Sequence, residues 1–292
     1  MFEKILIMSD GSPVSDSLLP CVAELKRLGC QQAVLCHIID VETAAGLQDE
    51  ITRQLRPKLE QQQEQLRAQG IEASIEIPTG LVHIEVNRLV VEQGCSLIVV
   101  ASHSHNLARD LLVGVNACSV IRHARVPVLI SRVEVLEQGR RCRALCSDLF
   151  RHVLFPTDFS DTAEEAFTGL EDLVAQTPAR VTLLHVQDSI RIEPYLHDRL
   201  EEFNRIDRER LERMAAALGE RGATEVDYRL ALGHPVQEIL KEAVSGDYTL
   251  IVLGSQGRGY FTQEILGGVA HRVMNHASQP VLLVPSPDNI SA

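Results

Sequence analysis

Residues 254–268 read GSQGRGYFTQEILGG, and residues 101–115 read ASHSHNLARDLLVGV. Each stretch follows a short apolar run of the kind that forms a buried strand, at residues 250–253 and 97–100. The two stretches are therefore interpreted as one element that occurs twice in the chain. They differ in their glycines, because the first stretch contains a spaced set of glycines and the second retains only Gly114.

The repetition extends over both halves of the chain. The aligned pairs include Asp10 with Asp158, His37 with His185, Gly80 with Gly233, Gly114 with Gly267 and Pro127 with Pro280. A repeat of this length is too long for one unit of a solenoid, which indicates a duplicated domain. We predict an N-terminal domain at residues 1–135, a linker without strand pattern at residues 136–150 and a C-terminal domain at residues 151–287.

Short apolar runs alternate with helical patterns in each half. This alternation predicts two doubly wound α/β domains, each a five-stranded parallel sheet of the Rossmann-like type with helices on both faces. Such sheets bind ligands at the carboxyl ends of their strands, where the strand order reverses. We expect Ser12 to cap the first helix of the first domain, with Pro13 at the first helical position, and Ser160 or Asp161 to cap the first helix of the second. Pro57 is expected to kink or break a long helix.

The composition of the 292 residues limits the possible partners and locations. The net charge of −12 leaves no basic surplus for a nucleic acid. No apolar run is long enough to span a membrane, and the first residues lack the pattern of a secretion signal. The seven cysteines all lie within residues 21–146, which favours reduced thiols in the cytoplasm. Cys142 and Cys146 are expected to be ordinary thiols of the linker, with a metal or redox role as the alternative.

The glycines of residues 254–268 predict a cup of backbone N–H groups for an anion. Glycine tolerates a positive φ, and its missing side chain lets a ligand approach the main chain. A helix that begins near Gly267 would add the positive end of its dipole, and Arg258 would add charge. The alternative from spacing alone is that these glycines only form a tight loop between a strand and a helix.

The unit resembles a universal stress protein domain, and the chain resembles the tandem form of that family. ATP-binding members carry the motif G-x2-G-x9-G-[S/T] after strand four and an aspartate after strand one. Gly254, Gly257 and Gly267 match the spacing, and Asp158 matches the aspartate. Gly268 stands where the family has serine or threonine. This departure predicts weaker binding, because one hydroxyl donor is missing.

The resemblance implies that the C-terminal domain binds an adenine nucleotide, most simply ATP, with no metal other than nucleotide-associated magnesium. Asp158 would contact the ribose, Thr157 and Val186 would line the adenine slot, and Val269 would continue the phosphate turn. The full set of binding residues expected is Pro156, Thr157, Asp158, Val186, Leu253, Gly254, Gln256, Gly257, Arg258, Gly267, Gly268 and Val269. The alternative for Asp158 is a residue that only caps the turn and the helix.

The N-terminal copy departs from the motif, because Ala101, Ser104 and Val115 replace two glycines and the hydroxyl residue. We therefore expect this copy to be a relic used for packing or for another ligand. His103 and His105 lie in its altered loop, where a shared metal ion is an alternative to ordinary polar loop residues.

No catalytic motif occurs in the chain, so slow ATP hydrolysis is the most that we expect of it as an enzyme. The resemblance implies a cytoplasmic stress-response regulator whose two domains pair through their last strands as an internal pseudo-dimer, with a homodimer also possible. Two other readings remain open. In one, both pockets have diverged to a ligand other than a nucleotide or to a partner protein. In the other, the chain is a slow ATPase or a nucleotide-transfer enzyme.

Overall fold

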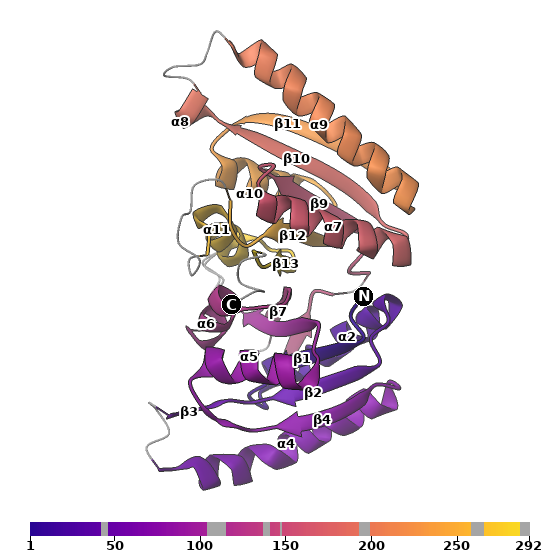
Figure 1. The fold of residues 1–292 in the computed structure, drawn as a ribbon. Coiled ribbons are helices and arrows are strands. Elements are labelled where there is room, and N and C mark those ends of the chain that lie inside the picture. Colours follow the sequence, from indigo (N-terminus) through magenta and orange to yellow (C-terminus); the bar gives the residue numbers. More distant parts are fainter. Residues whose placement is uncertain are drawn as a thin grey trace. The chain divides into compact units, whose positions relative to one another are not determined.

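The computed structural model describes residues 1–41, 46–103, 115–136, 141–146, 148–192, 199–257 and 266–286. The chain divides into two compact units, the first with residues 1–147 and the second with residues 148–287. Each unit contains a mostly parallel sheet with helices packed against it (Figure 1). The predicted doubly wound α/β fold is confirmed in both units.

The second unit contains a five-stranded parallel sheet in the order β11-β10-β9-β12-β13. The strands are β9 (His152–Thr157), β10 (Arg180–Asp188), β11 (Glu225–Gly233), β12 (Leu250–Gly254) and β13 (Val281–Val284). Every residue of β9 is buried. The neighbours β9 and β12 mark the point where the strand order reverses, which is where sheets of this kind bind ligands.

The helices of the second unit are α7 (Asp161–Gln176), α8 (Ser189–Ile192), α9 (Leu200–Arg221), α10 (Pro235–Ser245) and α11 (Gly268–His276). Helix α7 contacts α9, and α10 contacts α11 (Figure 1). Of the two expected caps, Ser160 is the residue that caps α7, because its Oγ accepts a hydrogen bond from the N–H of Ala163 at 3.4 Å. Leu211 and Leu218 of α9 are completely buried, so the helix face that carries them packs against the rest of the unit.

The first unit repeats this arrangement, with the parallel order β4-β2-β1-β6-β7. Its strands are β1 (Lys4–Met8), β2 (Gln32–Cys36), β3 (Ile39–Asp40), β4 (Glu72–Glu76), β5 (Thr79–Gly80), β6 (Leu97–His103), β7 (Val128–Leu136) and β8 (Arg141–Ala144). Its helices are α1 (Pro13–Asp16), α2 (Leu19–Leu25), the 3-10 helix η1 (Lys26–Leu28), α4 (Gln48–Ala68), α5 (Val82–Gln93) and α6 (Val115–His123). None of the described helices of either unit combines the length and the apolarity that a membrane span requires.

Two expectations about the helices of the first unit have different outcomes. Ser12 caps α1 and Pro13 occupies its first turn, which confirms the predicted start. Pro57 was expected to kink or break this helix, and the break is wrong, because α4 runs without interruption through this proline. The lost backbone hydrogen bond is offset by packing, since Leu55 and Leu59 on either side of Pro57 are both buried.

The segment expected to be a linker without strands contains β8. This strand turns back and pairs antiparallel with β7, with Val133 opposite Ala144 and Leu136 opposite Arg141. The expectation that residues 136–150 have no strand is therefore wrong. The sequence pattern gave no warning, because β8 alternates arginines with Cys142 and Ala144 at an edge of the sheet.

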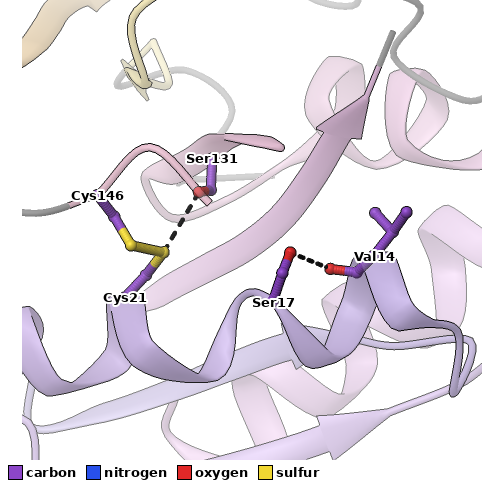
Figure 2. The surroundings of a disulfide bond; sticks show 5 residues. All are labelled: Val14, Ser17, Cys21, Ser131 and Cys146. Atoms are coloured by element: carbon purple, nitrogen blue, oxygen red, sulfur yellow. Dashed lines mark hydrogen bonds between the residues drawn. A yellow bond between two sulfur atoms is a disulfide. The ribbon is translucent and has the colours of Figure 1, made fainter. Parts of the chain in front are cut away.

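A disulfide bond joins Cys21 in α2 to Cys146 just after β8 (Figure 2). The Cα atoms of the two residues are 5.3 Å apart, and the Oγ of Ser131 lies 3.4 Å from the Sγ of Cys21. The expectation of reduced thiols is therefore wrong for this pair, whereas Cys142 is free as expected. The bond fastens the end of the β7–β8 hairpin to α2.

Candidate functional site

A cavity of about 750 Å³ lies in the second unit at the carboxyl ends of β9, β10 and β12. We call it the β9–β12 cavity, and its volume suits a small-molecule ligand. The residues expected at a nucleotide site that line it are Pro156, Thr157, Asp158, Val186, Leu253, Gly254, Gln256, Gly257, Gly267, Gly268 and Val269. The twelfth residue of that set, Arg258, lies outside the described residues.

Asp158 is held by the loop that links β9 to α7. Its Oδ1 accepts hydrogen bonds from the N–H of Ser160 at 3.1 Å and from the Oγ of Ser160 at 2.6 Å. This is the capping role that the sequence left as an alternative, and the structure shows it. Asp158 also lines the β9–β12 cavity, and its Oδ2 lies close to Gly257. One carboxylate therefore braces the loop with one oxygen and faces the glycine loop with the other.

The glycines of the motif are required for close packing. None of Gly254, Gly257 and Gly267 has a positive φ, so the expectation that they serve left-handed backbone is wrong. A Cβ at Gly254 would lie 2.9 Å from the carbonyl oxygen of Thr162, and a Cβ at Gly257 would lie 2.6 Å from Oδ2 of Asp158. The second expected reason holds, because a side chain at Gly254 would meet the backbone of α7 and one at Gly257 would displace the carboxylate of Asp158.

The start of α11 faces the same cavity. Gly267 is the N-cap of this helix, and its N–H donates to the carbonyl oxygen of Ser255 at 2.8 Å. Gly268 and Val269, the first two residues of the helix, line the cavity. The first N–H groups of a helix have no acceptor within it, and they carry the positive end of the helix dipole. The arrangement is suited to an anion.

Helix α9 forms a wall of the cavity that the sequence did not assign. Phe203, Ile206, Asp207 and Arg210 line it, at the spacing of one helix face. The apolar stripe of α9 was visible in the sequence, but a stripe does not reveal whether its residues meet a core or a cavity. The one available signal was in the spacing of the aligned residues, because Asp188 and Gly233 are five residues further apart than Asp40 and Gly80.

A buried polar group connects α9 to the sheet. Asp207 Oδ2 accepts a hydrogen bond from Nε2 of Gln187 at 2.8 Å and lies 3.5 Å from Nε2 of His185. The Nδ1 of His185 donates to the carbonyl oxygen of Thr157 at 2.7 Å. These bonds fix the carboxylate of Asp207 at the cavity wall, where it can accept a hydrogen bond from a ligand.

Another wall of the cavity comes from α10 and α11. His234, Pro235, Val236 and Ile239 lie around the start of α10, and Arg272 extends from α11. The apolar residues among them offer a surface for a flat, partly apolar group, while Arg272 brings positive charge to a cavity of an acidic protein. Sequence reasoning missed all five, because no motif marks the start of α10 and because Arg272 lies beyond the motif glycines at the start of α11.

The corresponding loop of the first unit shares the backbone bond to its aspartate but has a different serine hydroxyl as the second donor. Asp10 Oδ1 accepts from the N–H of Ser12 at 3.0 Å and from the Oγ of Ser15 at 2.5 Å. The Nδ1 of His37 donates to the carbonyl oxygen of Ser9 at 2.9 Å, as His185 does to Thr157. In this unit α4 packs directly on the loop, and the buried side chain of Gln62 accepts from the Oγ of Ser9 at 2.7 Å. The altered motif loop, residues 104–114, lies outside the described residues.

Metal binding has no support in the part of the chain that the structure describes. Within it, no group of three or more histidine, cysteine, aspartate or glutamate side chains is arranged to hold a metal ion. The alternative of a metal shared by His103 and His105 falls on the side chain of His103 and on residue 105, which are not described.

Comparison with known proteins gives one consistent family. The model of the universal stress protein family matches residues 1–132 and 149–285. A universal stress protein of Mycolicibacterium smegmatis is 25% identical over 295 residues, covering 96% of each chain. A universal stress protein of Methanocaldococcus jannaschii is 29% identical over 157 residues, which cover 47% of this chain and 96% of that protein. The crystal structure of a universal stress protein from Archaeoglobus fulgidus has the same fold, with a TM-score of 0.76 at 22% identity over 98% of this chain and 99% of that one.

Proposed function

The chain belongs to the universal stress protein family, and on that premise we propose that its C-terminal domain binds an adenine nucleotide, first of all ATP, in the β9–β12 cavity. The observation that carries the proposal is the convergence of three elements on one cavity. These are the carboxylate of Asp158, the glycines that follow β12 and the first residues of α11. Asp158 offers a hydrogen-bond acceptor for hydroxyl groups, and the glycines and the start of α11 offer N–H donors for phosphates.

The parts of the nucleotide are assigned from the chemistry of the walls. The ribose hydroxyls donate to Asp158, and the phosphate chain accepts from backbone N–H groups near Gly257 and Gly268. Thr157 and Val186 flank the base, and Val269 lies beside the phosphates. Magnesium enters only with the nucleotide, and hydrolysis is at most slow, since a phosphate clamp alone does not activate water.

The test compares two aspartates that each accept a hydrogen bond from the N–H of the serine two residues further along the chain. Asp158→Ala is expected to weaken ATP binding by roughly tenfold or more, because hydrogen bonds to a charged group are lost. Asp10→Ala removes the equivalent brace in the N-terminal domain and is expected to leave ATP affinity unchanged. The measurement is calorimetric titration of ATP, preceded by acid extraction of the purified protein and chromatography for adenine nucleotides.

Three outcomes of this test separate the readings. Equal loss in both aspartate variants would point to a general effect on the fold and not to contact with a ligand. A wild-type protein that neither retains nor binds adenine nucleotides would favour the reading in which both pockets have diverged. Phosphate release above background that disappears in Asp158→Ala would favour the slow ATPase.

Gly268→Ser restores the hydroxyl that the family motif has at this position. We expect ATP affinity to rise by about fivefold to tenfold, since one hydrogen bond adds on the order of 1 kcal/mol. Gly268 is exposed at the first position of α11, so the side chain fits there. Titration of ATP and of adenosine checks the result, because adenosine lacks phosphates and its affinity should not change.

We also propose that the chain acts as a cytoplasmic stress-response regulator, with domains at residues 1–135 and 151–287. An internal pseudo-dimer of the two domains is part of this proposal, and small-angle scattering of the whole chain with and without ATP tests it together with homodimer formation. A scattering mass of two chains would establish the homodimer. Because disulfides are rare in the cytoplasm, the thiol state of Cys21 and Cys146 in cell extracts tests the location.

A further inference from the structure

Phe159 has a backbone conformation that is rare for an aromatic residue. It follows Asp158 in the loop between β9 and α7, and its φ is +56°. A bulky side chain in this left-handed region is energetically unfavourable. The surrounding structure compensates for that cost, since the N–H of Phe159 donates to Oγ1 of Thr157 at 3.0 Å and its ring lies 4.5 Å from the ring of His185.

The first unit has glycine at the aligned position. Gly11 follows Asp10 and has a φ of +64°, so the two loops share one backbone conformation. A Cβ at Gly11 would lie 2.9 Å from Cδ1 of Leu55 and 2.9 Å from Cδ of Lys58. Helix α4 therefore leaves no space for a side chain in the first unit. In the second unit a whole phenyl ring occupies this place.

The buried leucines align the two long helices. Two equally spaced pairs are fully buried, Leu59 with Leu66 in α4 and Leu211 with Leu218 in α9. In this register Leu55 corresponds to Asp207, and Lys58 corresponds to Arg210. The residues that close over the loop in the first unit thus have counterparts that line the β9–β12 cavity in the second. The ring of Phe159 stands between the loop and α9.

Arg210 is held by this ring. Its guanidinium carbon lies 5.1 Å from the centre of the Phe159 ring, within the range of a cation–π contact. Arg205 on the same helix is paired with Glu209 at 2.8 Å, whereas no described acidic residue forms an ion pair with Arg210. The guanidinium lines the cavity with its donors available to a ligand.

We propose that Phe159 is a positioning residue that holds α9 off the β9 loop and presents Arg210 to the cavity, where Arg210 contacts the phosphate chain of the bound nucleotide. The inference rests on the proposed function and deepens it. Guanidinium groups recognise phosphate through paired N–H donors. The positive charge of Arg210 also favours phosphate binding in a chain whose net charge is −12 and whose motif lacks its hydroxyl at Gly268.

The first experiment separates phosphate contact from base contact. Arg210→Gln is expected to weaken ATP binding roughly 10- to 100-fold, the range for a lost charge-assisted hydrogen bond, and to leave adenosine affinity within about twofold. The matched control is Arg208→Gln, which removes the same charge from an exposed position of α9 that does not line the cavity. Titrations of adenosine, AMP, ADP and ATP give the number of phosphates at which the two variants diverge.

The second experiment tests whether Phe159 acts through Arg210. Phe159→Gly keeps the backbone conformation that Gly11 shows, and it is expected to lower ATP affinity by about the same factor as Arg210→Gln. The double variant is expected to bind ATP no worse than Arg210→Gln alone, because residues that act through one contact are not additive. Phe159→Leu, which removes only the ring, serves if the glycine variant does not melt cooperatively.

The other outcomes of these two experiments would each contradict a specific part of the inference. Equal ATP affinity of Arg210→Gln and Arg208→Gln in a protein that binds ATP would remove the role of Arg210 and leave the proposed function standing. Additive losses in the double variant, or an equal loss for adenosine, would remove the positioning role of Phe159. A wild-type protein that binds no adenine nucleotide overturns the proposed function, and this inference fails with it.

Discussion

Gly257→Asp is expected to remove detectable nucleotide binding from the C-terminal domain. The new Cβ would meet Oδ2 of Asp158 at 2.6 Å, so the carboxylate that faces the cavity must move. The new side chain also places a second negative charge beside the first, and both repel the phosphate chain. Lost hydrogen bonds and repulsion together amount to on the order of 3 kcal/mol or more, which is at least about 100-fold in affinity.

The control for this variant adds the same charge to a glycine away from the cavity. Gly219 lies exposed in α9, and a Cβ there would meet no other atom within 4 Å. Gly219→Asp is expected to bind ATP as the wild type does in a calorimetric titration. Circular dichroism establishes that both variants are folded. Wild-type affinity in a folded Gly257→Asp protein would place the ligand elsewhere and would remove the nucleotide assignment of the glycine loop.

Cys146→Ser is expected to lower the free energy of unfolding of the first unit by on the order of 3–5 kcal/mol in the absence of reductant. The disulfide joins residues 125 positions apart, so it removes much of the freedom of the unfolded chain. The bond also holds the β7–β8 hairpin to α2, and its loss should expose the backbone of β8 to solvent. Hydrogen exchange of peptides from residues 141–146, combined with urea unfolding, measures both effects.

Cys142→Ser is the matched control, because Cys142 is a free thiol in β8, the strand that immediately precedes Cys146. It is expected to unfold at the urea concentration of the wild type, and added reductant should bring the wild type to the curve of Cys146→Ser. Identical curves for Cys146→Ser and the oxidised wild type would show that the bond does not constrain the first unit.

The architecture could be predicted from the sequence because local sequence patterns determine it. The repeat, the five parallel strands of each unit, the caps Ser12 and Ser160 and the family itself all follow from short stretches or from their spacing. The position of Asp158 and Gly257 in one cavity was predictable for the same reason, since strand ends in a parallel sheet meet at one edge.

What the sequence could not give depends on distant parts of the chain. Cys21 and Cys146 are far apart in sequence, and seven cysteines allow many pairings. The tolerance of Pro57 depends on what α4 packs against. The roles of Asp207 and Arg210 depend on how far α9 stands from the sheet, and a helical stripe carries no information on that distance. The reason for the motif glycines was also hidden, because crowding by Thr162 and Asp158 has no signature in the motif.

The bond between Cys21 and Cys146 has a consequence for the order in which the protein is made. The ribosome synthesises Cys21 in α2 125 residues before Cys146. The thiol of Cys21 therefore has no disulfide partner during most of the synthesis of the first unit. A gene fragment that stops at residue 136 encodes all five parallel strands of the first sheet and still leaves this thiol without its partner. A gene fragment that encodes the first unit together with its disulfide must therefore include Cys146, which lies in the segment between the two domains.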